Sequence, residues 1–193
     1  MKKLLLILLC LPLLFTTCKK EDEEPTNNTN NNNSGNSTNL SIGDTHQGGI
    51  IFYLDGNGGG LIVAQSPDQS PDWGNDWGIF GTAISGADGT AIGTGNQNTI
   101  DIEAGNTTAG TAADICANLT LGGYSDWFLP SKDELNEIYL QRNGGNIGGF
   151  EWGPYWSSSE IDSGFAWGQD FLDGLQQINN KETFANVRAI RAF

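Results

Sequence analysis

Histidine and cysteine are scarce in this chain of 193 residues, and their scarcity excludes several kinds of site. The single histidine is His46, and the three cysteines stand at positions 10, 18 and 116. One histidine without a nearby cysteine pair gives no zinc site of the usual spacing. A serine run at positions 157–159, beside Glu160, has no base near it in the sequence, so we expect no catalytic triad. We expect these serines to hydrogen-bond neighbouring backbone groups instead.

Basic residues are also few. The chain has 9 Lys and Arg against 23 Asp and Glu, which gives a formal net charge of −14 at pH 7. Beyond residue 39 the only basic residues are Lys132, Arg142, Lys181, Arg188 and Arg191. An acidic surface repels phosphate groups, so a nucleic-acid partner is excluded.

No apolar run in the sequence is long enough to span a bilayer. The longest covers twelve residues, Leu4 to Phe15, and follows two lysines, whereas a membrane span takes roughly 20 residues. A short apolar run behind basic residues is typical of a secretory signal peptide, which we place at residues 1–17. Small residues then precede Cys18 and resemble the bacterial lipobox, so we predict that Cys18 is the site of lipid attachment.

Two alternatives to lipidation at Cys18 follow from the same stretch. Ordinary secretory cleavage near Thr17 would leave Cys18 incidental, and Cys10 is a competing site that we set aside because leucines flank it. If Cys18 carries lipid, Cys116 has no partner for an intrachain disulfide. Cys116 falls on the apolar face of a predicted helix, where a lone cysteine acts as a small core residue.

Residues 18–39 form an acidic and then Asn-rich tether. Lys19 to Glu24 resembles the surface-export signal of Bacteroidetes lipoproteins, although a solvated spacer is the simpler reading of such a charge run. The segment from Pro25 to Asn39 has no apolar residue, so we expect it to be disordered, with a mean reach of roughly 20 Å. These features predict a protein anchored by lipid to the outer membrane and exposed at the cell surface.

Residues 40–193 have the length of one domain. Two apolar runs, 49–54 and 61–64, flank a glycine-rich turn and predict a β-hairpin. The turn lacks the Lys-Ser or Lys-Thr of a phosphate-binding loop. We expect residues 66–99 to form a long loop region, because they hold many Gly, Asp and Asn residues without periodicity.

Two helices and three further strands follow the loop region. The first helix is expected over residues 109–119, and the second over Ser131 to Arg142, where Ser131 and Glu134 form a capping box. The strands are expected at 154–160, 165–172 and 184–193, the last beside the N-terminal hairpin. The sequence therefore predicts an α+β fold with two helices, an antiparallel sheet and a long loop region.

Several blocks of this sequence are similar to one protein family. They cover residues 48–53, 123–131, 155–160, 166–167 and 187–191. Together they resemble the family named after the C-terminal domain of the Legionella collagen-like protein, over residues 41–193. The resemblance implies a C-type-lectin-like fold and an extracellular adhesion or ligand-binding domain. It also implies sulphated polysaccharides, the reported ligands of the founding member, although an acidic domain should bind them poorly.

The sequence departs from calcium-dependent lectins in two ways. Those proteins carry Glu-Pro-Asn or Gln-Pro-Asp and Trp-Asn-Asp triplets, and none occurs here. They also use disulfides. Calcium-dependent sugar binding therefore does not carry over. A separate calcium site is suggested by four acidic residues, whose oxygen atoms calcium prefers: Glu160, Asp162, Asp170 and Asp173. The alternative for these residues is a solvated acidic surface.

Three tryptophans in glycine-rich segments are candidates for ligand binding: Trp73, Trp77 and Trp152. Their aromatic faces could stack on sugar rings, and the alternative is internal packing. We therefore expect a surface lipoprotein with a non-catalytic lectin-like binding or adhesion domain for a glycan or a surface protein, with no cofactor beyond the calcium suggested above. The alternatives are a structural or assembly component of the cell envelope and, with little support, a hydrolase.

Overall fold

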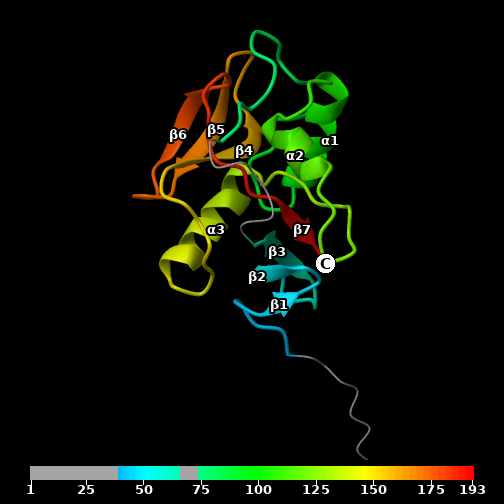
Figure 1. Cartoon of the computed structure of the whole chain (residues 1–193), viewed down its shortest axis with the longest axis vertical. Coiled ribbons are helices and arrows are strands. Elements are labelled where there is room, and N and C mark those ends of the chain that lie inside the picture. The colour runs from blue at the N-terminus through cyan, green and yellow to red at the C-terminus, as the bar shows by residue number, and fades with distance from the viewer. Residues whose placement is uncertain (1–38, 66–73) are drawn as a thin grey trace, which may run out of the picture. The chain divides into compact units, whose positions relative to one another are not determined.

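The computed structural model describes residues 39–65 and 74–193. The predicted signal peptide, Cys18, the tether up to residue 38 and Trp73 lie outside the described residues. The described ranges hold the following helices and strands (Figure 1): β1 Thr45–His46, β2 Gly49–Leu54, β3 Gly60–Ala64, α1 Gly95–Gly105, α2 Ala112–Ala117, α3 Lys132–Asn143, β4 Pro154–Glu160, β5 Phe165–Asp170, β6 Gln176–Asn180 and β7 Ile190–Ala192. The structure therefore confirms a mixed α+β fold.

The first sheet has the strand order β1-β2-β3-β7, and all its pairs are antiparallel. The predicted hairpin forms β2 and β3. The last strand pairs with this hairpin, with Leu61 opposite Ala192 and Val63 opposite Ile190, as the sequence predicted. It is shorter than expected, since only residues 190–192 of the predicted 184–193 form a strand.

The second sheet is an antiparallel meander in the order β4-β5-β6. Strands β4 and β5 begin where the sequence predicted them, and β5 ends two residues earlier than expected. The third member, β6, was not predicted, because the sequence Gln-Gln-Ile-Asn-Asn has no apolar alternation. The domain therefore contains two antiparallel sheets rather than the single sheet expected.

The capping box that the sequence predicted at the start of α3 is present. Ser131 Oγ accepts a hydrogen bond from Glu134 N at 3.4 Å, and Glu134 Oε2 accepts one from Ser131 N at 2.7 Å. The predicted helix over residues 109–119 is shorter in the structure, as α2. Helix α1 was missed, because its first residues overlap the predicted loop region and Thr94 makes no side-chain cap hydrogen bond.

The core consists of two hydrophobic clusters, both built from the compact unit Asn39–Phe193. Adjacent residues of one segment contribute to different clusters: Trp127 packs in the first and Phe128 in the second. The backbone of Phe128 bridges to Ile190 through hydrogen bonds of 2.8 and 2.9 Å. Because the unit contains both clusters and both sheets, it holds a complete core of its own. No helix within the described ranges is both long and apolar enough to cross a membrane.

Candidate binding surface

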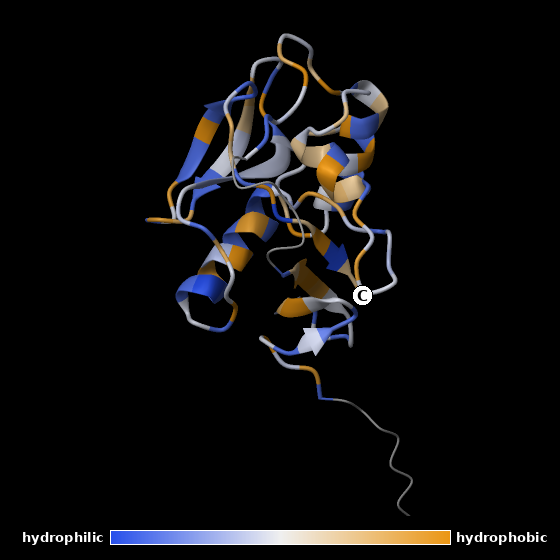
Figure 2. Cartoon of the chain, in the orientation of Figure 1, coloured by the Kyte–Doolittle hydropathy of each residue, from blue (hydrophilic) through white to orange (hydrophobic). Residues whose placement is uncertain are grey.

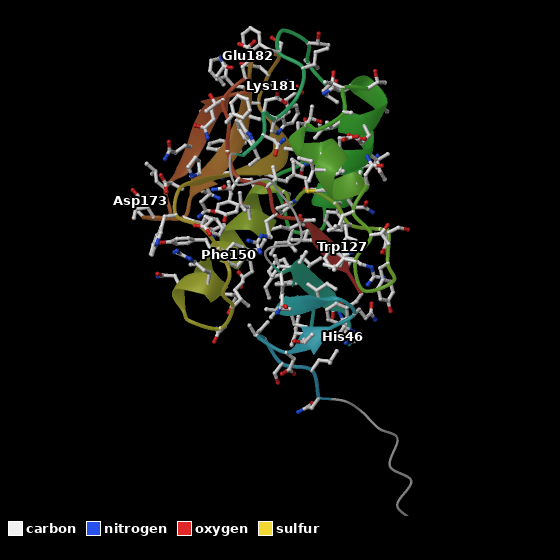
Figure 3. All side chains as sticks on the ribbon, viewed as in Figure 1. His46, Trp127, Phe150, Asp173, Lys181 and Glu182 are labelled. Atoms are coloured by element: carbon white, nitrogen blue, oxygen red, sulfur yellow. The ribbon has the colours of Figure 1, made fainter. Side chains whose placement is uncertain are left out.

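The serine run of β4 is buried, and the hydroxyls of Ser157 and Ser159 bond backbone groups as predicted. Ser157 Oγ donates to Trp167 O at 2.8 Å, and Ser159 Oγ donates to Gly89 O at 2.6 Å. Ser158 Oγ accepts from the side chain of Asn98 at 3.2 Å. His46 lies in β1 of the other sheet, where its ring packs edge-on against Phe193 at 4.6 Å (Figure 3). The structure therefore gives these serines structural partners and places His46 elsewhere.

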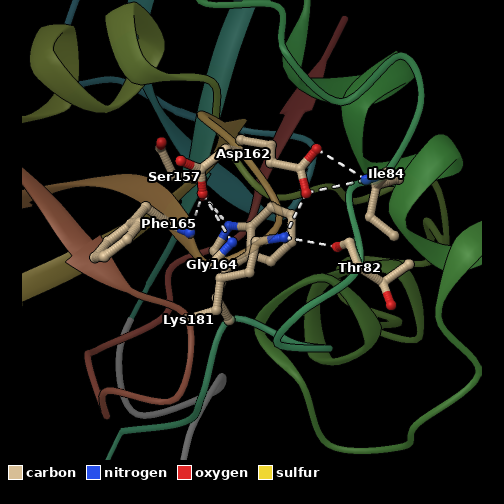
Figure 4. Close-up of polar contacts among 9 residues, drawn as sticks. Thr82, Ile84, Ser157, Asp162, Gly164, Phe165 and Lys181 are labelled. Atoms are coloured by element: carbon tan, nitrogen blue, oxygen red, sulfur yellow. Dashed lines mark hydrogen bonds and ion pairs between the residues drawn. The ribbon is translucent and has the colours of Figure 1, made fainter.

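Glu160, a predicted calcium ligand, is buried in an ion pair with Lys181 (Figure 4). Its two carboxylate oxygens also accept from Ile84 N at 3.0 and 2.9 Å. The Lys181 Nζ donates to Thr82 O at 3.2 Å and lies 4.5 Å from the centroid of the Trp77 ring. The Glu160 carboxylate thus joins the chain around residues 82–84 to the second sheet.

The other three predicted calcium ligands each stabilise a turn. Asp162 Oδ1 accepts from Gly164 N at 2.8 Å, in the turn between β4 and β5. Asp170 Oδ1 accepts from Leu172 N at 2.8 Å and Asp173 Oδ1 from Leu175 N at 2.9 Å, both in the turn between β5 and β6. These turns lie at opposite ends of β5. Among the described residues no three His, Cys, Asp or Glu side chains gather as a metal site would require.

The structure separates the predicted tryptophans. Trp77 is completely buried, and its Nε1 donates to Ser157 O at 2.8 Å. The prediction that Trp77 contacts a ligand is therefore wrong, because its ring is enclosed by the first hydrophobic cluster. Trp152 is the opposite case, with 67% of its surface exposed.

Arg142, in the last turn of α3, packs against the ring of Trp152. The guanidinium carbon of Arg142 lies 4.2 Å from the centroid of the Trp152 ring, and Arg142 also donates to Phe171 O at 2.7 Å. Phe171 N in turn donates to Gly153 O at 2.8 Å, which extends the β4–β5 pairing beyond Pro154 and Asp170. Trp152 directly precedes Gly153, and Leu172 directly follows Phe171 in the turn after β5.

A packed group of aromatic rings lies beneath this position. Tyr155 and Phe171 are 4.3 Å apart between ring centroids, and Phe150 and Tyr139 contact Phe171 at 5.4 and 5.6 Å. Figure 3 labels Phe150 on the same side of the domain as Asp173. Leu172 and Leu175, in the adjacent turn, are both well exposed. We call Trp152, Arg142, Leu172 and Leu175 the Trp152 surface.

Sequence reasoning identified Trp152 but missed the other members of this surface. Arg142 was interpreted only as a helix-ending residue, and the exposed leucines have no pattern that marks them. The signal that could have found them is the β4–β5 register, because it places the segment before β4 opposite the turn after β5.

All the basic side chains of the described residues lie against aromatic rings. The cation lies 4.6 Å from the ring centroid for Lys132 and Trp167, 4.2 Å for Arg142 and Trp152, 4.5 Å for Lys181 and Trp77, 4.4 Å for Arg188 and Phe150, and 3.9 Å for Arg191 and Tyr124. The few cations of the domain therefore help to hold it together.

A family profile described as the Lcl C-terminal domain matches residues 83–191, a segment that runs from the chain before α1 to β7. It includes Trp152 and the whole of the second sheet. A comparison with curated protein sequences finds no significant match.

Proposed function

Because the chain belongs to the Lcl C-terminal domain family, we propose that it is a non-catalytic binding domain whose Trp152 contacts a carbohydrate. The observation that carries this proposal is an exposed tryptophan held in place by Arg142 on a packed aromatic base. An ordered ring loses little conformational entropy on binding, and its flat apolar face suits the C–H face of a sugar ring.

We propose that the carbohydrate is uncharged. The chain has a net charge of −14, and its described basic residues already lie against aromatic rings. A sulphated polysaccharide would meet few available cations and a repulsive surface. A neutral glycan avoids this electrostatic cost and still gains from stacking on Trp152.

The remaining parts of the proposal rest on the sequence. We propose that Cys18 is lipidated and that residues 18–39 hold the domain away from an outer membrane, at the cell surface. The order of helices and strands supports a C-type-lectin-like fold. The internal hydrogen bonds of Ser157 and Ser159, together with the position of His46 in the other sheet, support a role without catalysis.

The experiment is a glycan array probed with the unit Asn39–Phe193. The array should carry neutral, sialylated and sulphated glycans, and we expect signal on neutral ones. Trp152→Ala should remove this signal. Phe80→Ala is the matched control, because Phe80 is also an exposed aromatic residue (49%) and packs near Gly164 at the other end of the β4–β5 hairpin. Binding that survives Trp152→Ala, or binding to sulphated glycans alone, would overturn the proposal.

A second candidate function is docking to a protein of the cell envelope. The observation in its favour is the exposure of Leu172 and Leu175 in the turn that follows Phe171, whose carbonyl binds the Arg142 under Trp152, since exposed apolar side chains gathered on one surface mark protein interfaces. If the ligand is a protein, Leu172→Ala and Leu175→Ala should weaken its binding as strongly as Trp152→Ala does. A glycan should depend chiefly on the tryptophan ring.

A further inference from the structure

Strand β6 is the outer strand of the second sheet, and within the described residues it pairs only with β5. Its sequence is Gln-Gln-Ile-Asn-Asn. It carries no charge, no proline and no bulge, which are the features that usually protect the edge of a sheet from pairing with another strand.

The hydrogen bonds at both ends of β6 show which backbone groups face outward. Lys181 N donates to Gly164 O at 3.0 Å, and Asp170 N donates to Leu175 O at 2.9 Å. In an antiparallel pair the residues directed toward the partner strand alternate with those directed away. Odd-numbered residues of β6 therefore face β5, and the N–H and C=O groups of Gln176, Ile178 and Asn180 point away from β5. The Asn180 carbonyl also accepts from Thr183 N at 2.9 Å, in the turn that follows the strand.

The side chains next to this edge form an apolar strip. Ile178 lies opposite Trp167, and Asn180 lies opposite Phe165, so Phe165, Trp167 and Ile178 share one face of the sheet. Ile178 is 56% exposed and Phe165 is also exposed. The apolar residue is visible as a single orange band on the otherwise hydrophilic β6 (Figure 2).

Helix α3 covers part of the same face, and its Lys132 Nζ lies 4.6 Å from the centroid of the Trp167 ring. Gln169 donates from its side chain to Asn136 at 2.9 Å, and Gln176 donates to Lys132 O at 3.2 Å. Within the described residues, Ile178 and Phe165 on the other half of this face remain exposed to solvent. The open backbone groups and the apolar strip therefore lie side by side.

We propose that β6 pairs in antiparallel fashion with β6 of a second copy of this chain. The strand is nearly symmetric about Ile178, so a two-fold axis there places Ile178 opposite itself, Gln177 opposite Asn179 and Gln176 opposite Asn180. The outward backbone groups of Ile178 then bond to their own counterparts, and the two apolar strips join. A second copy fits because the five paired residues of each strand carry no charge, so that the two strands themselves meet without like charges between them.

Electrostatics give the pairing a characteristic salt dependence. Each copy is strongly negative, so two copies repel at long range, and added salt screens this repulsion. The dimer should therefore tighten as salt concentration rises. An association based on ion pairs would weaken instead.

The test is sedimentation equilibrium of the unit Asn39–Phe193 over a range of protein and salt concentrations. We expect a monomer–dimer equilibrium that shifts toward dimer with salt. Ile178→Lys should weaken it by about a hundredfold or more, since each dimer loses two buried isoleucines and gains two like charges. Ile100→Lys is the matched control, because Ile100 is 53% exposed on α1, and it should leave the equilibrium unchanged.

Cross-linking checks the register independently. Hydrogen-bonded antiparallel pairs have Cα atoms about 5.5 Å apart, within reach of a disulfide. Ile178→Cys should therefore form a disulfide-linked dimer on mild oxidation, and Ile100→Cys should not. A protein that stays monomeric at every concentration and salt, or dimers that persist in Ile178→Lys, would overturn the proposal. Binding of glycans at Trp152 is a separate matter that neither result affects.

Discussion

The guanidinium of Arg142 lies against the ring of Trp152 and also donates to the carbonyl oxygen of Phe171. One side chain of α3 thus connects an exposed aromatic ring with the turn that follows β5. The ring face against Arg142 is occupied, and the exposed part of the ring is available to a ligand. This relationship makes Trp152 an ordered part of the surface.

Arg142→Ala should loosen the Trp152 surface and destabilise the domain by about 2 kcal/mol. The change removes a partly exposed cation–π contact and a charged hydrogen bond to Phe171 O. Urea unfolding measures the free energy, and tryptophan fluorescence anisotropy reports the mobility of the ring. Arg142→Lys should keep only part of the stability and of the ring's order, since lysine lacks the planar guanidinium group of arginine. Equal stability of both variants and the parent protein would show that Arg142 is not what holds the ring.

Ser131→Ala should cost about 1 kcal/mol of stability without changing ligand binding. Ser131 Oγ caps α3 by accepting from Glu134 N, and it also donates to Ala91 O at 2.9 Å. Thermal or urea unfolding measures the cost. Thr94→Ala is the control, because Thr94 makes no capping hydrogen bond at the start of α1. A larger loss in Thr94→Ala than in Ser131→Ala would contradict this assignment.

Breaking the buried ion pair of Lys181 and Glu160 should be strongly destabilising. Lys181→Met leaves a buried carboxylate without its cation, which typically costs about 3–5 kcal/mol. Adding Glu160→Gln should recover part of this cost, because the amide oxygen can still accept from Ile84 N. The parent protein, the two single variants and the double variant form a double-mutant cycle, and urea unfolding measures the stability of each. Additive losses would show that the two residues do not act as a pair.

Cys116 should resist alkylation in the folded protein. Burial raises the pKa of its thiol well above the ordinary 9.0, and the Glu103 carboxylate adds a smaller upward effect. Because the thiol pKa is higher in the folded than in the unfolded chain, its contribution to stability is present below about pH 9 and is lost as the pH rises further. Iodoacetamide labelling followed by mass spectrometry should modify Cys116 in urea only. Rapid labelling without urea would mean that the first hydrophobic cluster opens readily.

Local signals in the sequence predicted the elements that carry them. The capping box of Ser131 and Glu134 marked α3, and the glycine-rich turn marked the first hairpin. Helix α1 and strand β6 were missed for a common reason. Their sequences are polar and rich in poor formers of either structure, and contacts with distant segments decide their conformation. The buried side chain of Asn98, for example, bonds Gly89 O and Ser158.

The candidate surface was predictable only in part. Trp77 and Trp152 both lie in glycine-rich sequence, and nothing local indicates that the first is enclosed and the second exposed. Burial of Trp77 depends on Ser157 and Lys181, which are distant in the chain. The four acidic residues looked similar in sequence, yet one forms an internal ion pair and three stabilise turns at opposite ends of β5.

The most direct test of the account is a calorimetric titration of the unit Asn39–Phe193 with the neutral glycan that gives the strongest array signal. The account predicts that Trp152→Ala weakens binding by at least about tenfold, or 1.4 kcal/mol, while Phe80→Ala binds as the parent protein does. Unchanged affinity in Trp152→Ala, an equal loss in Phe80→Ala, or an array with no neutral ligand at all would contradict it.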